Sequence, residues 1–341
     1  MLLFGTSRPI VRTLGAAAFA VAGMFGSASH AQDRDLLNVS YDIARELYAA
    51  LNPVFIEQWK AETGENLTVE QSHAGSSKQA RAILQGLKAD LVTFNQVTDV
   101  QILADNGFVD EDWQKDLPNN ASPYYSLPAF LVRGGNPKGI KDWDDLARDD
   151  VSIVFPNPKT SGNARYTYLA AYAYALDKFK GDDAAAQEFV GKVLSNVAVF
   201  DTGGRGATTS FVEREIGDVL ITFEAEVEGV RTAEAEGAYE RVVPSMSILA
   251  EFPVALVRKV AEERGTTDVA EAYLNFLYTK PAQEIIASFY NRVHDADVVA
   301  ATADKFPEVR LVTVEDVFGG WAEADKVHFS DGGTLDKLLR N

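Results

Sequence analysis

The chain has 341 residues, which is more than one compact core usually contains, so we expect two lobes and a processed segment. Hydrophobic residues make up 46% and charged residues 24%, which is typical of a globular protein and argues against disorder. Cysteine is absent, which excludes disulfides and thiolate metal ligands. The net charge of -18 argues against nucleic-acid binding, because that binding depends on basic side chains.

Residues 1–31 have the pattern of a secretory signal peptide. Arg8 and Arg12 form a short basic region, residues 13–24 are apolar, and Ser29-His30-Ala31 offers small residues for a signal peptidase. The alternative is a membrane anchor, but the apolar run is short for a span of about 20 residues. No cysteine follows that could carry a lipid. We therefore predict cleavage after Ala31 and export from the cytoplasm.

The next part of the chain alternates between strand-like and helix-like segments. Strands are predicted at residues 36–41, 66–71 and 90–94, and helices at residues 44–63 and 74–86. This repeated order predicts a mostly parallel sheet covered by helices.

A stretch rich in proline and asparagine, residues 117–128, interrupts this pattern, and we interpret it as a crossing between lobes. A second block follows, with strands at 153–155, 197–200 and 218–223 and helices at 164–176, 206–215 and 224–236. Residues 242–251 are loop-like and could cross back, and helices near 269–278 and 281–290 would complete the first lobe. The predicted fold class is α/β, with residues 32–122 and 250–341 in lobe I and residues 123–249 in lobe II.

Small residues and predicted helix starts follow four of these strands. They lie at residues 41–42, 73–77, 160–164 and 202–206. In an open α/β sheet such turns lie at the carboxyl edge, where ligands bind. Helix starts have free N–H groups and a partial positive charge, so several that converge could hold an anion without a cation. Distant carboxylates are screened over about 8–10 Å and do not prevent this. Such turns are also common as plain connections, so the residues alone leave both interpretations open.

Several strings in the chain resemble the bacterial periplasmic sulfate- and thiosulfate-binding proteins. They are Tyr41-Asp42, QSHAGS at 71–76, PNPKTSG at 156–162, DTGGRG at 201–206, and residues 139–146, 211–220 and 317–321. The resemblance extends from about residue 36 to residue 335. It implies a type II periplasmic binding fold with the ligand cleft between the lobes, and a role as the solute-binding component of an ABC importer. A monomer in the periplasm that docks on a membrane permease is therefore expected.

The same resemblance implies a site without charged side chains at the ligand. Asp42 and Ser76 would contribute from the first lobe, and Ser161, Gly162, Asn163 and Gly204 from the second. Backbone N–H groups would be the donors at Asp42, Gly162, Asn163 and Gly204, and Ser161 would donate its hydroxyl.

Two residues depart from the pattern of the family. Phe223 stands where the family has a tryptophan that donates its indole N–H, and Asn163 stands where a second glycine is usual. Phenylalanine has no donor. A hydrogen bond to a charged group is worth about 1.5–3 kcal/mol, so its loss could weaken sulfate binding by roughly 10- to 150-fold. The Asn163 amide could replace this donor, or the site could be adapted to thiosulfate, an organic sulfonate or a sulfate ester.

Other polar residues near these loops have simpler interpretations. We expect Arg165 and Arg205 to pair with carboxylates and to brace the loops. His73 is expected to orient its own loop by hydrogen bonding. Glu224 could accept a proton from hydrogen phosphate, but the alternation of the strand predicts that Phe223 faces inward instead.

The sequence contains no pattern typical of an enzyme. It has no G-x-S-x-G motif, no nucleotide phosphate loop and no dinucleotide fingerprint. The histidines, His30, His73, His294 and His328, do not have the spacing of zinc ligands. We expect no catalytic residue, metal or cofactor. Three hypotheses stay open: a receptor for sulfate or thiosulfate, a receptor for another oxyanion or a small organosulfur anion, and a secreted hydrolase on the same scaffold.

Overall fold

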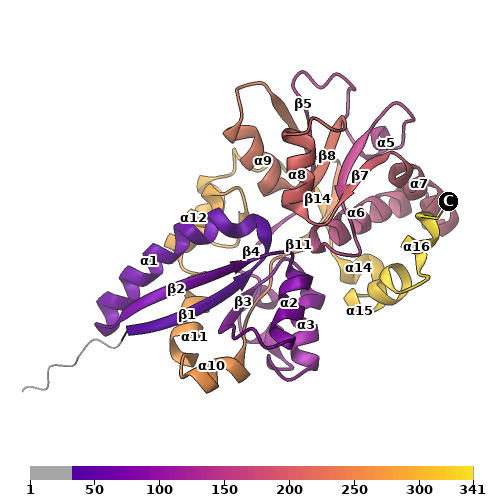
Figure 1. The fold of residues 1–341 in the computed structure, drawn as a ribbon. Coiled ribbons are helices and arrows are strands. Elements are labelled where there is room, and N and C mark those ends of the chain that lie inside the picture. Colours follow the sequence, from indigo (N-terminus) through magenta and orange to yellow (C-terminus); the bar gives the residue numbers. More distant parts are fainter. Residues whose placement is uncertain (1–32, 341) are drawn as a thin grey trace, which may run out of the picture.

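The computed structural model describes residues 33–340. The predicted signal peptide lies outside the described residues. Within residues 33–340, no helix combines the length and the hydropathy that crossing a membrane requires. Figure 1 shows two regions of sheet and helix that lie side by side.

The first region is built on a four-stranded sheet with the order β12-β3-β1-β2. Its strands are β1 (Asp33–Ser40), β2 (Asn66–His73), β3 (Leu91–Thr93) and β12 (Val254–Leu256). The first three are parallel, and β12 is antiparallel to β3. Its helices are α1 (Arg45–Thr63), α2 (Ser76–Leu84), α3 (Val97–Asp105), α10 (Arg258–Arg264), α11 (Thr267–Phe276) and α12 (Lys280–Ser288).

The longest of these helices, α1, shows why the sequence folds in this way. Leu47, Leu51 and Phe55 recur at helical spacing and are buried against the core, whereas the other faces of α1 are largely exposed. The helix ends where Gly64 adopts a left-handed backbone conformation, with φ of 76°, and its N–H bonds to the Lys60 carbonyl. The apolar stripe thus fixes which face of α1 packs on the sheet.

The second region is built on a five-stranded sheet with the order β7-β6-β8-β5-β9. Its strands are β5 (Pro128–Arg133), β6 (Ile153–Pro156), β7 (Val197–Asp201), β8 (Val219–Phe223) and β9 (Tyr239–Val242). β6 is parallel to β7 and β8, and β5 is antiparallel to β8 and β9. Its helices are α6 (Gly162–Lys178), α7 (Asp183–Ser195), α8 (Gly204–Val212) and α9 (Glu224–Ala233).

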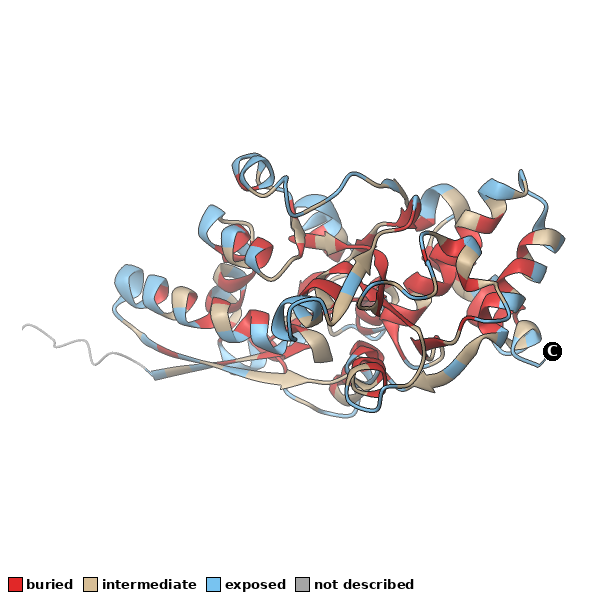
Figure 2. Cartoon of the chain, turned by 90° about the horizontal axis from the view of Figure 1, so that it is seen from above, coloured by how far each residue is buried: buried red, intermediate tan, exposed pale blue. Residues whose placement is uncertain are grey.

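Helices cover both faces of this sheet, and the side chains that point to either face are therefore apolar. On β5, Phe130 belongs to the large core that includes α6, whereas Leu131 packs with Phe211 of α8 and Val227 of α9. Successive side chains of a strand point to opposite faces, so both must be apolar when each face carries helices. Figure 2 shows buried residues concentrated along the strands and the inward sides of the helices.

Short strands join the two regions. The three-stranded sheet β11-β4-β13 combines β4 (Tyr124–Ser126), β11 (Ala250–Glu251) and β13 (Arg292–Val293), all antiparallel. A further parallel pair joins β10 (Met246–Ile248) to β14 (Arg310–Val312). The remaining short elements are η1 (Asp42–Ala44), η2 (Trp113–Lys115), α4 (Pro118–Ala121), α5 (Trp143–Leu146) and α13 (Ala296–Ala301).

The C-terminal segment consists of α14 (Val314–Phe318), α15 (Trp321–Ala324), the π-helix Asp325–Phe329 and α16 (Thr334–Leu338). It packs on helices of the second region, where the hydroxyl of Tyr168 on α6 lies 3.1 Å from Nδ1 of His328 and Leu338 of α16 lies next to Gly191 of α7. Since this segment follows elements of the first region, it extends from one region to the other. The proposed lobe boundaries stay a prediction.

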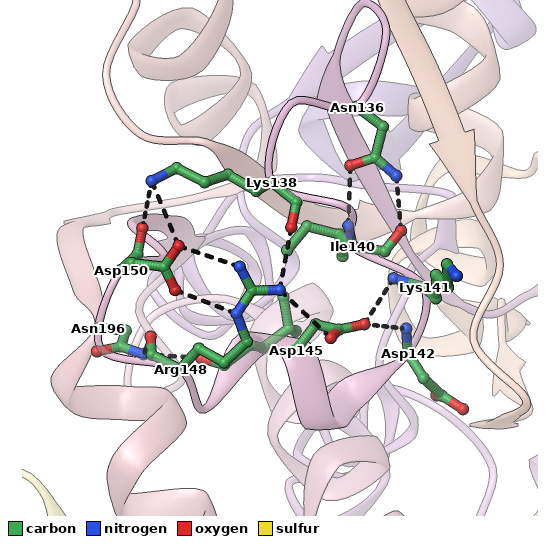
Figure 3. A network of polar contacts seen from close by, with 10 residues as sticks. Asn136, Lys138, Ile140, Lys141, Asp142, Asp145, Arg148, Asp150 and Asn196 are labelled. Carbon is green, nitrogen blue, oxygen red and sulfur yellow. Dashed lines mark hydrogen bonds and ion pairs between the residues drawn. The ribbon is translucent and has the colours of Figure 1, made fainter.

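A network of polar contacts fixes the irregular connection between β5 and β6 (Figure 3). Asn136 exchanges two hydrogen bonds with the backbone of Ile140, and Arg148 pairs with Asp150 at 3.0 Å and donates to the Lys138 carbonyl. Asp142 and Asp145 form a capping box at the start of α5. These bonds satisfy backbone N–H and C=O groups in this stretch that are not hydrogen-bonded within a strand or a helix.

The predicted α/β class with mostly parallel strands is confirmed, but several elements differ from the predictions. The supposed crossing at residues 117–128 contains α4 and β4, and residues 242–251 contain β10 and β11 where a loop was expected. The sequence patterns also missed β5 and α7. Proline and asparagine obscured β5 because Pro128 occupies its first position, where a strand tolerates proline.

Candidate functional site

Five strand-to-helix turns, from the carboxyl ends of strands in both regions, meet at one seam. The first region supplies the turns after β1, β2 and β3, and the second supplies the turns after β6 and β7. The residues at the starts of the following helices are Asp42, Ser76, Gln96, Gly162 and Gly204. The seam therefore brings together Asp42, Ser76, Gly162 and Gly204, which were predicted separately along the chain.

Glycines show how closely the two sides approach. A Cβ atom placed on Gly162 would lie 2.8 Å from Asn95 Oδ1 and 2.8 Å from the Cβ of Gln96. A Cβ atom on Gly203 would lie 2.8 Å from a carboxylate oxygen of Asp42. Non-bonded heavy atoms do not approach so closely without displacement. The two regions are thus in contact here through backbone, and side chains at these positions would hold them apart.

The helices that begin at the seam are not capped by side chains. The N-cap residues of α2, α3, α6 and α8 are Gly75, Gln96, Ser161 and Gly203, and none of them makes a side-chain cap bond. Elsewhere α5, α7, α13 and α14 are capped by Asp142, Asp182, Asp295 and Thr313, while α1, α9, α10, α11 and α12 also lack a side-chain cap bond. The first-turn N–H groups at the seam therefore remain available to a ligand, and the helix dipoles favour a negative one.

The two serines at the seam differ in what their hydroxyls can offer. Ser76 Oγ lies 2.7 Å from Asn95 Oδ1 and 2.6 Å from Asp99 Oδ2, so its single proton is shared with these two acceptors and not offered to a ligand. Burial raises the pKa of the Asp99 carboxyl, and the bonds from Ser76 and Ser77 oppose that shift. Ser161 is also buried, but its hydroxyl makes no hydrogen bond within residues 33–340. Ser161 can thus donate its hydroxyl to a ligand, whereas Ser76 has its backbone N–H to offer.

Asp42 lies against the start of α8 and faces the other region with its carboxylate. Burial raises the pKa of Asp42, while the backbone N–H groups of Arg205 and Ile43 lower it. Oδ1 accepts the Ile43 N–H at 3.0 Å. The carboxylate is therefore occupied by protein N–H groups, which leaves the backbone as the part of Asp42 that suits an anion.

The two residues that depart from the family pattern lie on neighbouring elements. Asn163 Nδ2 donates to Thr222 Oγ1 at 2.8 Å, so one of its two amide N–H groups is already used. Phe223 is fully buried, and its ring packs edge-on against Phe252 with a centroid distance of 5.1 Å. Phe223 supplies no hydrogen-bond donor at this position.

The charged side chains around the seam are paired with protein groups, as predicted for the two arginines. Arg165 bonds to Asp325 at 3.1 Å, and Arg205 bonds to Glu46 at 2.9 Å. Glu224 is buried and pairs with Arg292 at 2.7 Å. His73 contacts the Tyr41 carbonyl through Nδ1 at 3.1 Å, in agreement with its expected role in the loop. The seam thus presents mainly neutral groups.

The model of the family described as bacterial extracellular solute-binding protein matches residues 42–290, which is well over half of the chain. The chain belongs to this family.

Individual relatives of this solute-binding protein agree with the resemblance predicted from its motifs. A thiosulfate-binding protein of Escherichia coli (strain K12) is 58% identical, over 92% of this chain and 93% of that protein. A sulfate-binding protein of Salmonella typhimurium (strain LT2) is 50% identical, over 91% of this chain and 94% of that protein. The structure of the sulfate-binding protein SubI from Mycobacterium tuberculosis H37Rv superposes with a TM-score of 0.78 at 34% identity, covering 87% of this chain and 99% of that one. The predicted family and fold class are confirmed.

The sequence patterns missed one turn of this solute-binding protein's seam. Asn95 and Gln96 follow β3 and touch Gly162. Their position directly after a predicted strand was the available signal, because the carboxyl ends of parallel strands share one edge. The turn contains no glycine, whereas three of the other four turns do.

A cavity of about 650 Å³ lies next to the seam. Its lining includes Tyr41, Phe223, Phe252, Arg205 and Glu226. Burial raises the pKa of the Glu226 carboxyl, while Arg205 and a bond from Thr208 oppose that shift. The cavity gives space beside the ring of Phe223.

Residues 33–340 contain no group of three or more histidine, aspartate or glutamate side chains arranged to hold a metal ion. The family is one of solute-binding proteins and not of enzymes.

Proposed function

We propose that this protein is the receptor of an ABC importer and binds sulfate or thiosulfate between its two lobes through neutral hydrogen-bond donors. The observation that carries the proposal is the meeting of four uncapped helix starts from both regions at one seam. Backbone N–H groups and the Ser161 hydroxyl would surround the anion, with Asp42, Ser76, Gly162, Asn163 and Gly204 acting through their backbone. The relatives named as thiosulfate- and sulfate-binding proteins support this choice of ligand.

The proposed lobes are residues 32–122 with 250–341 and residues 123–249. An anion that contacts both would stabilise the closed arrangement, which is a hinge-type population shift. We further propose that residues 1–31 are a signal peptide, that the mature protein is a periplasmic monomer, and that the closed form docks on a membrane permease.

Calorimetry with a panel of anions tests the proposed ligand. Sulfate and thiosulfate should bind, while hydrogen phosphate should bind more weakly, because its proton would meet only donors and each unpaired buried group costs about 1–3 kcal/mol. Tight binding of phosphate or molybdate with no binding of sulfate or thiosulfate would refute the proposal.

A second candidate is a receptor for a small organosulfur anion, such as a sulfonate or a sulfate ester. The cavity beside Phe223 favours it, because 650 Å³ is far more room than an inorganic anion needs and its walls include aromatic rings. In the same calorimetric series, a sulfonate that binds more tightly than sulfate would select this candidate.

A further inference from the structure

One buried polar group at the seam has no partner. Gln96 is fully buried at the start of α3, and its Oε1 makes no hydrogen bond within residues 33–340. The side chain touches the position that a Cβ atom on Gly162 would occupy, with 2.8 Å between the two Cβ atoms. Buried polar groups in proteins normally find a partner, so this one calls for an explanation.

The neighbouring bonds show which way the amide should be turned. Gln96 Nε2 lies 3.1 Å from Thr98 Oγ1, and Thr98 Oγ1 also accepts from Arg165 Nη1 at 3.3 Å. In this arrangement the threonine oxygen accepts two bonds, while the amide oxygen of Gln96 has no donor. The oxygen and nitrogen of an amide have nearly the same shape, and their assignment follows from the surrounding bonds.

Rotating the amide by half a turn gives its oxygen a donor and leaves its nitrogen in need of an acceptor. The Thr98 hydroxyl then donates to Oε1 of Gln96 while it still accepts from Arg165. The nitrogen Nε2 takes the place of the unpartnered oxygen and presents N–H groups there. An N–H group that is buried at this point of the chain needs an acceptor, and an anion held by the start of α6, whose Gly162 lies against the Cβ of Gln96, would provide one.

We propose that Gln96 contacts the bound anion and donates a side-chain N–H group to it. This inference rests on the proposed function, and it names a donor that lies on the first region, opposite Ser161. A neutral donor of this kind compensates in part for Phe223, which donates nothing.

Two substitutions test the donor role by calorimetry with sulfate and thiosulfate. Gln96→Leu keeps the size but removes the donor, and affinity should fall about tenfold or more. Gln96→Glu replaces the donor by a carboxylate, and affinity at about pH 8 should fall further because two negative charges meet. As the pH is lowered towards about 5, the introduced carboxyl takes up a proton and can donate, so its deficit should shrink. The wild-type protein should show no such recovery.

The control is Gln101→Leu, which changes an exposed glutamine of the same helix and should leave affinity within about twofold. Thermal unfolding of each variant without ligand verifies that it is folded. Affinities within about twofold of wild type for both Gln96 variants would overturn the inference while leaving the proposed function intact. A wild-type protein that binds neither anion would refute the proposed function, and the inference with it.

A crystal structure of the wild-type protein with thiosulfate provides a second measurement that needs no variant. We expect the Gln96 amide nitrogen within about 3.2 Å of the anion. A separation beyond about 4 Å would contradict the contact, whatever the variants do.

Discussion

At the scale of single residues, the site depends on a few side chains among many backbone groups. Ser161 is a buried residue whose hydroxyl makes no hydrogen bond in residues 33–340, whereas the Ser76 hydroxyl is already bound to Asn95 and Asp99. Phe223 lies at the edge of the cavity and provides no donor. Removing the Ser161 hydroxyl should therefore weaken anion binding, and adding a donor at position 223 should strengthen it.

Replacing Ser161 by alanine should weaken sulfate binding at least about tenfold, since a hydrogen bond to an anion is lost. Isothermal titration calorimetry measures the change. Ser195→Ala is the matched control, because Ser195 is exposed and bonds to the Lys192 carbonyl on α7. Equal affinities in the Ser161 variant and the control would show that the ligand lies elsewhere.

Replacing Phe223 by tryptophan should tighten sulfate binding about tenfold or more, because the indole N–H restores a donor. The adjacent cavity of about 650 Å³ leaves room for the larger ring. Unchanged affinity would mean that Phe223 does not occupy the donor position, or that Asn163 or Gln96 already compensates. A structure of the variant with sulfate would distinguish these cases.

At the scale of elements, the starts of the helices determine how closely the two regions approach. A methyl group on Gly162 would collide with Asn95 and Gln96, whereas one on Gly75 would lie at an ordinary 3.6 Å from the Thr160 carbonyl. These two glycines therefore offer a matched pair of substitutions on opposite sides of the seam.

Gly162→Ala should lower sulfate affinity by more than about tenfold, because the lobes can no longer close around the anion. Gly75→Ala should leave it nearly unchanged. Small-angle X-ray scattering with saturating sulfate gives an independent measurement: the Gly162 variant should stay more extended than wild type. A variant that closes normally would show that the seam tolerates the extra methyl group.

The π-helix carries a titratable group in its aromatic packing. Burial lowers the pKa of His328 from 6.5 to about 4, and its ring packs against Tyr172 with centroids 4.7 Å apart. Below about pH 6.5 the unfolded chain takes up a proton that the folded chain takes up only near pH 4. The contribution of His328 to the free energy of unfolding is thus fully present above pH 6.5. It is lost as the pH falls towards 4, and the loss is at most about 3 kcal/mol.

His328→Phe should remove this share of the pH dependence. Urea unfolding at several pH values between about 4 and 8 would show a smaller decline for the variant than for wild type. The other buried histidines and carboxyls remain in both proteins and serve as the common background. Identical pH profiles would mean that His328 does not contribute.

At the scale of the whole molecule, one of the ion pairs that link the two regions lies at the surface, whereas the pair between Glu224 and Arg292 is buried. Arg205 of α8 and Glu46 of α1 are 2.9 Å apart, with about half of each side chain exposed (48% and 56%). Exposed pairs contribute about 0.2–1 kcal/mol. The pair between Arg205 and Glu46 should therefore contribute little to the attraction between the two regions.

Arg205→Met should change sulfate affinity by less than about fivefold, which is the limit that such an exposed pair sets. The residual effect should diminish at high salt because the charges are screened. Calorimetry at two ionic strengths measures both quantities. A loss of a hundredfold would instead indicate that Arg205 contacts the anion directly.

The sequence predicted much of this architecture because periodicity is local. The apolar stripe of α1 and the strands that lead to Asp42, Ser76 and Gly204 could be read from spacing alone. The strand β5 could not, since its burial on both faces comes from helices that lie far away in the chain. The turn that contains Gln96 could be placed at the sheet edge from its position after a predicted strand, but only the folded structure shows that Gln96 lies beside Gly162.

The absence of side-chain caps at the seam has a consequence for how the ligand selectivity of such a receptor can evolve. Backbone N–H groups are the same whatever amino acid carries them, so most single substitutions leave these contacts chemically unaltered. Selectivity for a different anion would then arise at the few positions where a side chain is proposed to face the ligand, namely Ser161, Gln96 and Phe223. Related receptors should diverge in ligand choice at these positions while the course of the turns stays the same.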